Sequence, residues 1–227
     1  MNVIELKGVT KVYQQGQIEV VAVDNLDLEV ARGEFTVLSG PSGSGKTTVL
    51  NMIGMLDVPT RGEILFEGID ASNLSRTARA RVRRDRIGFI FQAYNLIPVL
   101  TAYENAEMVM ALKGVPEKER KERVMSLLAE VGLSGMEGRR PDELSGGQQQ
   151  RVAIARAIAA EPAVVLADEP TANVDSETAK AILDLMQKLN EEREVTFLFS
   201  THDTLVMERA KRIVHLKDGR FQSETVR

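Results

Sequence analysis

The chain of 227 residues contains no cysteine, so it has no disulfide framework, thiolate metal ligand or cysteine nucleophile. It also lacks an apolar run of the roughly 20 residues that a bilayer-spanning helix needs. Its first ten residues, MNVIELKGVT, alternate like a strand and have neither the basic nor the apolar region of a secretory signal. We therefore expect a protein that reaches a membrane only through a partner.

The formal net charge is small, with 29 basic and 33 acidic residues giving -4. This balance provides no general attraction to nucleic acid or to an anionic membrane surface. The exception is a basic run at residues 76–86. Leu74, Ala78 and Val82 recur there every four residues, which predicts an amphipathic helix with a solvated basic face. We expect no direct nucleic-acid partner.

Hydrophobic patterning predicts an α/β fold. Short alternating segments within residues 1–35 and a strand near 62–67 indicate an N-terminal β-rich portion. Apolar runs at 163–167 and 195–199, with a helix at about 176–192 between them, are typical of parallel strands covered on both faces.

The middle of the chain is predicted to be helical, with helices near 101–112, 117–131 and 147–160. We predict one domain, in which a core formed by residues 1–92 and 161–227 is interrupted by a helical subdomain at 93–160. Near the end, Asp218-Gly219 between two strand-like runs predicts a hairpin.

A glycine-rich loop follows a predicted strand and precedes a predicted helix. Its sequence, GPSGSGKT at Gly40–Thr47, matches the phosphate-binding pattern G-x-x-x-x-G-K-[ST]. The backbone N–H groups would surround phosphate oxygens, Lys46 would reach the β- and γ-phosphates, and the Thr47 hydroxyl would bind Mg²⁺. The predicted contacts to ATP from this segment are Gly40, Pro41, Ser42, Gly43, Ser44, Gly45, Lys46, Thr47 and Thr48.

Two carboxylates end the predicted strand at 163–167. Asp168 would lie beside the phosphates and hold the water shell of the metal, and Glu169 could orient or deprotonate the attacking water. An apolar strand ending in Asp-Glu is common, so this reading depends on the phosphate-binding loop.

A second candidate anion site is Leu144-Ser145-Gly146-Gly147-Gln148, at the start of a predicted helix. A hydroxyl, bare backbone N–H groups and the positive end of a helix dipole suit an anion. An ordinary helix N-cap is the alternative. Two phosphate-binding surfaces in one chain are explained if ATP is held between two copies.

Together these segments resemble the ATPase subunit of ABC (ATP-binding cassette) transporters over nearly the whole chain. The resemblance implies a phosphate-loop NTPase core with a mixed, mainly parallel sheet, an antiparallel N-terminal β-subdomain and a helical insertion. It identifies Leu144–Gln148 as the signature motif that acts in trans. The resemblance also assigns Tyr13 to adenine stacking, Gln92 to the glutamine loop, Asp168 to the metal, Glu169 to catalysis, Asp175 to the D-loop and His202 to the γ-phosphate.

Within the family, Gly54–Gly62, Phe91–Pro98 and the doubled Gln149-Gln150 resemble the lipoprotein-releasing and macrolide-export branch. Val174 departs from that branch, which usually has leucine there, but the intact Glu169 argues against an inactive site. The resemblance implies an ATPase that binds ATP and Mg²⁺, pairs with a second copy and drives a separate transmembrane permease. It also implies a peripheral location on the cytoplasmic side of the inner membrane.

Other classes share some of these motifs. A kinase or GTPase would have the phosphate-binding loop without the signature motif. A DNA-repair ATPase would separate its two halves by a long coiled coil, and a translation-factor ATPase would join two cassettes in one chain. The transported substrate stays open, as do lipoprotein release, antibiotic or peptide export and a non-transport mechanical role.

Overall fold

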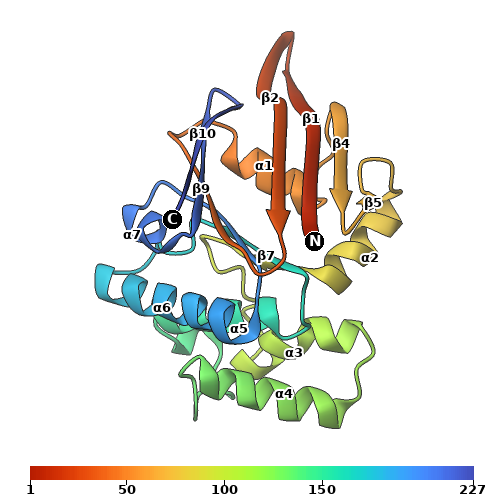
Figure 1. The fold of residues 1–227 in the computed structure, drawn as a ribbon. Coiled ribbons are helices and arrows are strands. Elements are labelled where there is room, and N and C mark those ends of the chain that lie inside the picture. The colour runs from red at the N-terminus through yellow and green to blue at the C-terminus, as the bar shows by residue number, and fades with distance from the viewer.

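The computed structural model describes residues 1–227, which form two β-sheets with helices between and around them (Figure 1). The strands of the four-stranded antiparallel sheet are, in order, β2 (Ile18–Ala31), β1 (Asn2–Gln15), β4 (Arg61–Phe66) and β5 (Ile69–Asp70). Those of the six-stranded sheet are β10 (Arg220–Val226), β9 (Arg212–Lys217), β3 (Phe35–Ser39), β8 (Phe197–Ser200), β7 (Val164–Asp168) and β6 (Ile87–Ile90). Only β10 runs antiparallel to its neighbour in this second sheet.

Seven α-helices and one 3₁₀ helix complete the chain. They are α1 (Lys46–Ile53), α2 (Arg76–Arg86), α3 (Ala102–Leu112), α4 (Glu117–Glu130), η1 (Pro141–Glu143), α5 (Gly146–Ile158), α6 (Ser176–Arg193) and α7 (Thr204–Arg209). None of these helices is both long enough and apolar enough to cross a bilayer.

The six-stranded sheet is covered on both faces, as its apolar strands predict. Side chains alternate along β3, so that Val37 belongs to one hydrophobic cluster and Leu38 to the other. The cluster of Val37 also contains residues of α3, α4, α5 and α6. That of Leu38 contains residues of α1 and the four-stranded sheet, so α1 packs between the two sheets.

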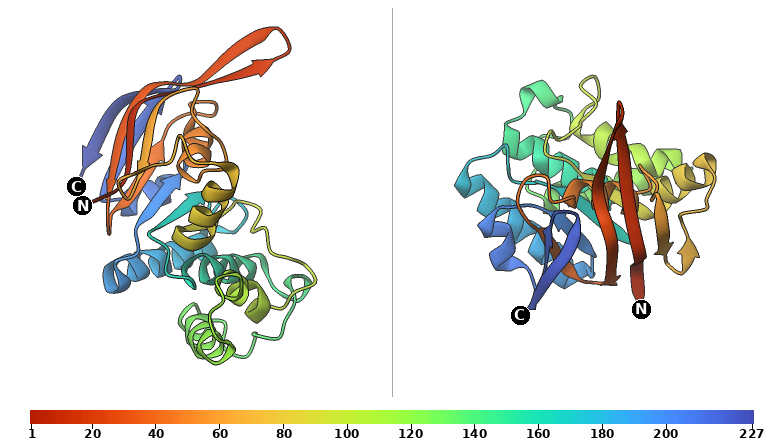
Figure 2. Two further views of the ribbon diagram at one scale, coloured as in Figure 1. Left: turned by 90° about the vertical axis from the view of Figure 1, so that its right-hand side faces the viewer. Right: turned by 90° about the horizontal axis from the view of Figure 1, so that it is seen from above.

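The predicted mixed sheet, antiparallel N-terminal sheet and terminal hairpin are confirmed. Two details differ. The short N-terminal segments join into two strands of 14 residues each, whose hairpin extends beyond the rest of the molecule (Figure 2). The helices α7 and η1, each six residues or fewer, were not predicted because so few residues show no helical period.

The predicted basic helix α2 is present, none of its residues is buried, and two of its arginines also bind neighbouring elements. Arg83 donates to the Met55 carbonyl at 2.8 Å. Arg86 donates twice to Glu67, at 2.7 and 2.6 Å. These contacts hold α2 against the end of α1 and the end of β4, which sequence periodicity alone does not indicate.

Candidate functional site

The parallel strands of the six-stranded sheet bring several of the predicted residues together at their carboxyl ends. β3, β8 and β7 are neighbours, and Ser200 is paired in register with both Leu38 and Asp168. Segments that follow parallel strands therefore meet at one edge of the sheet. The phosphate-binding loop follows β3, Glu169 follows β7, and His202 lies two residues after β8.

These segments line a cavity of about 510 Å³. Of the predicted residues it is lined by Tyr13, Ser42, Gly43, Gly45, Lys46, Thr47, Thr48, Gln92, Glu169 and His202, and its other lining residues are Val20, Val21, Ala22, Ala172 and Ser200. Gly40, Pro41, Ser44 and Asp168 do not line the cavity itself. The signature segment 144–148 and Asp175 also lie outside its lining.

The phosphate-binding loop is held in shape by its own lysine. Lys46 is 8% exposed, and its Nζ donates to the carbonyls of Gly40 at 2.7 Å and Pro41 at 3.0 Å. Gly45 has a φ of 93° and lies so close to the neighbouring hairpin that a Cβ would be 2.4 Å from the Ala22 carbonyl oxygen. Glycine is therefore required at this position of the loop.

Thr47, which lines the cavity, lies beside Asp168, which does not. The Thr47 hydroxyl lies 3.3 Å from each carboxylate oxygen of Asp168. Oxygen ligands suit Mg²⁺, which is usually bound by one or two carboxylates together with substrate phosphates and waters. The chain has no cluster of three His, Cys, Asp or Glu side chains that could hold a metal unaided. A hydroxyl and a carboxylate side by side fit a Mg²⁺ ion whose other ligands are phosphates and waters.

Both carboxylate oxygens of Glu169 have partners. The Thr201 hydroxyl donates to Oε2 at 2.7 Å, and Nδ1 of His202 lies 2.7 Å from Oε1. The Glu169 side chain is 18% exposed and that of His202 is 77% exposed. Glu169 also has a φ of 45°, uncommon outside glycine. Such strain persists where the surroundings fix it, and Glu169 lines the cavity.

The serine of the signature motif, Ser145, caps the N-terminus of α5, and its hydroxyl can still donate a hydrogen bond. Ser145 Oγ accepts from the N–H of Gln148 at 3.3 Å, and the Gln148 side chain accepts from the N–H of Ser145 at 2.9 Å. This capping box confirms the ordinary reading of the motif. A hydroxyl that accepts one hydrogen bond can still donate another, so capping leaves Ser145 able to contact an anion.

The two glycines of the signature motif have a packing role as well. A Cβ on Gly147 would be 2.4 Å from Cγ2 of Thr178, and one on Gly146 would be 2.8 Å from the Tyr94 hydroxyl. Asp175 caps α6 nearby and accepts from the Thr178 hydroxyl at 2.6 Å. That hydrogen bond, followed by those from backbone N–H groups, lowers the pKa of Asp175 below its ordinary value.

A network missed by the sequence analysis joins Gln92 to the signature helix. The Asn173 side chain donates to the Gln92 carbonyl at 2.8 Å, and the Tyr94 hydroxyl donates to the Asn173 carbonyl at 3.0 Å. Arg156 of α5 donates to the carbonyls of Tyr94, at 2.8 Å, and of Asn95. The guanidinium has no carboxylate partner, and burial lowers its pKa. No motif signals these contacts, because each joins residues more than 60 positions apart.

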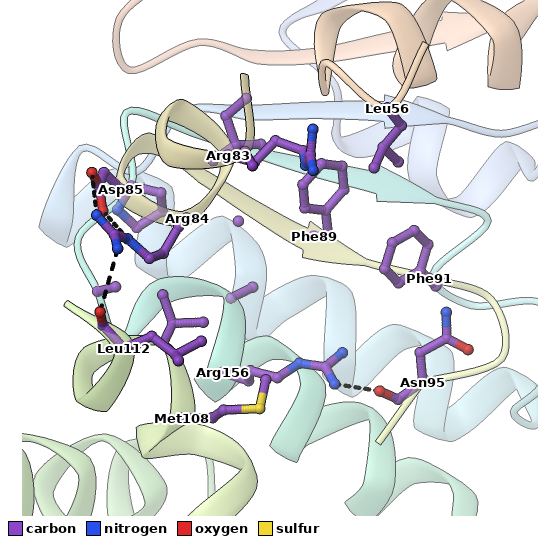
Figure 3. A pocket seen from close by; sticks show the side chains of 17 residues that line it. Leu56, Arg83, Arg84, Asp85, Phe89, Phe91, Asn95, Met108, Leu112 and Arg156 are labelled. Atoms are coloured by element: carbon purple, nitrogen blue, oxygen red, sulfur yellow. Dashed lines mark hydrogen bonds and ion pairs between the residues drawn. The ribbon is translucent and has the colours of Figure 1, made fainter. Parts of the chain in front are cut away.

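A second cavity, of about 370 Å³, lies between α2, β6, α3 and α5 (Figure 3). Ten of its 17 lining residues are hydrophobic, and they include Phe91, which immediately precedes Gln92. Leu56 and Leu112 lie at this cavity and are 50% and 62% exposed. The consecutive residues Phe91 and Gln92 therefore line different cavities, one mainly apolar and one with the phosphate-binding loop.

Comparison with known proteins agrees with this arrangement. The family described as ABC transporter matches residues 23–172. The lipoprotein-releasing system ATP-binding protein LolD of Anaeromyxobacter dehalogenans is 46% identical, over 97% of this chain and 93% of that protein. The macrolide export ATP-binding/permease protein MacB of Syntrophobacter fumaroxidans is 44% identical, over 99% of this chain and 32% of that protein.

A solved structure shows the same fold. It is a dimeric ATP-binding cassette in a post-hydrolysis state bound to ADP and Pi, and it superposes with a TM-score of 0.90 at 44% identity, covering 98% of each chain. Fold and sequence likeness therefore extend over almost all of this chain. The chain belongs to the ABC transporter family, as an ATP-binding subunit.

Proposed function

We propose that two copies of this chain hydrolyse ATP at their shared interface and drive a separate transmembrane permease for lipoprotein release or export. One observation carries the proposal. The phosphate-binding loop and Glu169 line the cavity of one chain, whereas Ser145, the N-cap of α5, lies outside that cavity. A second copy would supply the missing anion contacts, and the dimeric relative bound to ADP and Pi supports this arrangement.

Nucleotide binding would replace contacts that the loop now makes with itself. Lys46 would exchange the carbonyls of Gly40 and Pro41 for phosphate oxygens, since ammonium–phosphate hydrogen bonds are charge-assisted. The N–H groups of the loop and of the first turn of α1 would hold the remaining phosphate charge. Tyr13 lines the same cavity and would stack on adenine.

Mg²⁺ would be held by Thr47 and Gln92, with Asp168 acting through water. When bound, it would neutralise the charge that develops on the phosphates. The contact of the Thr47 hydroxyl with both oxygens of Asp168 supports this assignment, because it gathers hard oxygen ligands beside the loop.

Glu169 would act as general base on the attacking water. Thr201 and His202 keep its two oxygens in place, so the carboxylate is oriented before substrate arrives. His202 is mostly exposed and would also contact the γ-phosphate. Ser145 and Gly147 of the second copy would contact the same phosphate, with Asp175 near the interface.

Residues 93–160 would transmit the state of the site as a helical subdomain. Arg156 and Tyr94 connect the segment after Gln92 to both ends of α5, so a displacement of Gln92 would move the signature helix. The two-state element is the pair of cassettes, biased by the γ-phosphate that both copies hold.

The permease would contact the apolar cavity of Figure 3, on the cytoplasmic side of the membrane. The exposed Leu56 and Leu112 suit an apolar segment of the partner. Leu112→Glu should reduce co-purification with the membrane subunit. Val226→Glu, at a residue 69% exposed on β10, should not.

The central test uses Glu169→Gln. Turnover should fall about 10²- to 10⁴-fold because the general base is lost, while ATP binding persists. The variant should accumulate as an ATP-bound dimer on a sizing column, and Glu119→Gln, at an exposed position of α4, should behave like the unmodified chain. Full activity of Glu169→Gln would refute the general-base assignment. A strict monomer at saturating ATP would refute the shared interface.

A further inference from the structure

Two charged residues that belong to no recognised motif, Lys11 and Asp57, contact Tyr13 on the side away from the cavity. Its hydroxyl donates to Oδ2 of Asp57 at 2.8 Å. Nζ of Lys11 lies over its ring, 4.8 Å from the centroid, and donates to Oδ1 of the same carboxylate at 2.6 Å. Tyr13 lines the nucleotide cavity, whereas neither Lys11 nor Asp57 does.

Lys11 is itself fixed and largely removed from solvent. It is 9% exposed and makes a second hydrogen bond to the Val58 carbonyl at 2.9 Å. A cation over an aromatic face attracts the electron-rich ring, and more strongly where it is desolvated. Because Lys11 covers one face of Tyr13 and does not line the cavity, the opposite face is the one left for a ligand.

Asp57 fixes this cluster to the element that carries the phosphate-binding lysine. Its backbone N–H donates to the Asn51 carbonyl of α1 at 3.2 Å, and its Oδ1 accepts from the Val58 N–H at 2.7 Å. Helix α1 begins at Lys46. The base-binding ring and the phosphate-binding loop are thus joined through one short helix.

The charge state of the cluster favours its persistence near neutral pH. Although burial acts the other way, hydrogen bonds from Lys11 and Tyr13 keep the pKa of Asp57 below its ordinary value. Burial and the hydrogen bond to Asp57 raise the pKa of the Tyr13 phenol above 10.0, so it stays a donor. Both interactions with the carboxylate are therefore charge-assisted.

We propose that Asp57 and Lys11 are positioning residues for base binding, which preset the Tyr13 ring so that a purine stacks on its free face. This inference rests on the proposed function, in which Tyr13 stacks on adenine. A ring ordered before binding loses little conformational entropy when the base arrives, and that saving appears as affinity. The alternative is that the cluster only fastens β1 to the segment after α1.

The two readings differ in how variants bind a ligand without a base. Tyr13→Phe removes only the hydroxyl, and Asp57→Asn leaves one oxygen for two donors and removes the charge. Each should weaken ATP binding about five- to ten-fold, the effect of losing one or two hydrogen bonds. Inorganic tripolyphosphate, which reaches only the phosphate-binding loop, should bind both variants as it binds the unmodified chain.

A purely structural role would instead weaken ATP and tripolyphosphate equally, through the shared α1, and would overturn the proposal. Unchanged ATP affinity in both variants would also overturn it. If Asp57→Asn does not fold, Tyr13→Phe still decides the question, since it removes a single oxygen atom and keeps the ring. Tyr103→Phe, which removes a hydroxyl bonded to Glu107 away from the cavity, is the matched control and should bind both ligands normally.

Tyrosine fluorescence gives an independent readout. The chain has three tyrosines and no tryptophan, so stacking of a base on Tyr13 should change a large part of its emission. ATP should change the emission of the unmodified chain, and tripolyphosphate should not. If the unmodified chain binds ATP and tripolyphosphate equally well and with no emission change, stacking on Tyr13 itself fails. That result is distinct from failure of the positioning proposal, in which the unmodified chain shows stacking but Tyr13→Phe and Asp57→Asn do not lose ATP affinity selectively.

Discussion

The Thr201 hydroxyl donates a hydrogen bond to Oε2 of Glu169 at 2.7 Å, from a fully buried position directly after β8. Thr201→Val keeps the shape of the side chain but removes this donor. We expect kcat to fall about ten-fold, as a misoriented base loses part of its contribution. KM for ATP should change little, because Thr201 does not line the cavity.

Thr201→Ser provides the control in steady-state kinetics. It restores the hydroxyl and should recover most of the turnover, while a loss equal to that of the valine variant would show that packing of the methyl group, and not the hydrogen bond, is needed.

Substitution of Ser145 can distinguish its role as the N-cap of α5 from its proposed contact with the ATP of a second copy. Ser145→Ala should cost about 1 kcal/mol of stability through loss of the N-cap. Ser75→Ala removes the corresponding cap of α2, where Ser75 Oγ accepts from Ala78 N–H at 3.2 Å, and should cost about the same. In a Glu169→Gln background, sedimentation at saturating ATP should show a weakened dimer for Ser145→Ala only. Equal dimerisation of the two variants would leave Ser145 with the capping role alone.

Removal of Mg²⁺ should separate binding from hydrolysis. With a chelator in excess we expect turnover to stop. ATP should still change Tyr13 emission, because in the proposed site the loop and the ring contact ATP without the metal. Thr47→Ala should raise the half-saturating Mg²⁺ concentration about ten-fold. Thr60→Ala, whose hydroxyl accepts from the Val12 N–H, is a suitable control and should leave that concentration unchanged.

The ion pairs of Glu67 should make stability depend on pH. Hydrogen bonds from Arg86, and then from Arg32, lower the pKa of Glu67 below its ordinary value of 4.5. A depressed pKa gives a stabilisation that is complete above the unfolded value and is lost as the pH falls through the folded value. Glu67→Gln should therefore lower Tm at pH 7 by about 2–4 °C, or about 1 kcal/mol.

That difference in Tm should shrink as the solution is acidified below pH 4.5 and vanish once Glu67 is protonated in the folded chain. Glu119→Gln, at an exposed and unpaired carboxylate, should have the same Tm as the unmodified chain both at pH 7 and below pH 4.5. A Glu67→Gln deficit that stays constant down to acid pH would show that the ion pairs do not contribute.

Local sequence carried most of the fold and much of the candidate site. The phosphate-binding loop, the apolar strand before Asp168 and the capped helix at Ser145 each occupy one short continuous segment. Their conformations follow from glycine, from side-chain alternation and from capping, which act over a few residues. The strand–loop–helix order at Lys46 and the hairpin at Asp218-Gly219 could be predicted from the sequence for the same reason.

The sequence by itself therefore determined which segments are candidates for the chemistry, because those signals are local. Only the tertiary structure decided which residues support them. Thr201, after β8, reaches Glu169, after the neighbouring β7. Arg156 reaches Tyr94 across 62 positions, and Asp57 reaches Tyr13 across 44. Such contacts depend on strand order and helix packing, and no periodicity or spacing within one segment records them. The same packing places Ser145 away from the cavity of its own chain, which is why its proposed partner is a second copy.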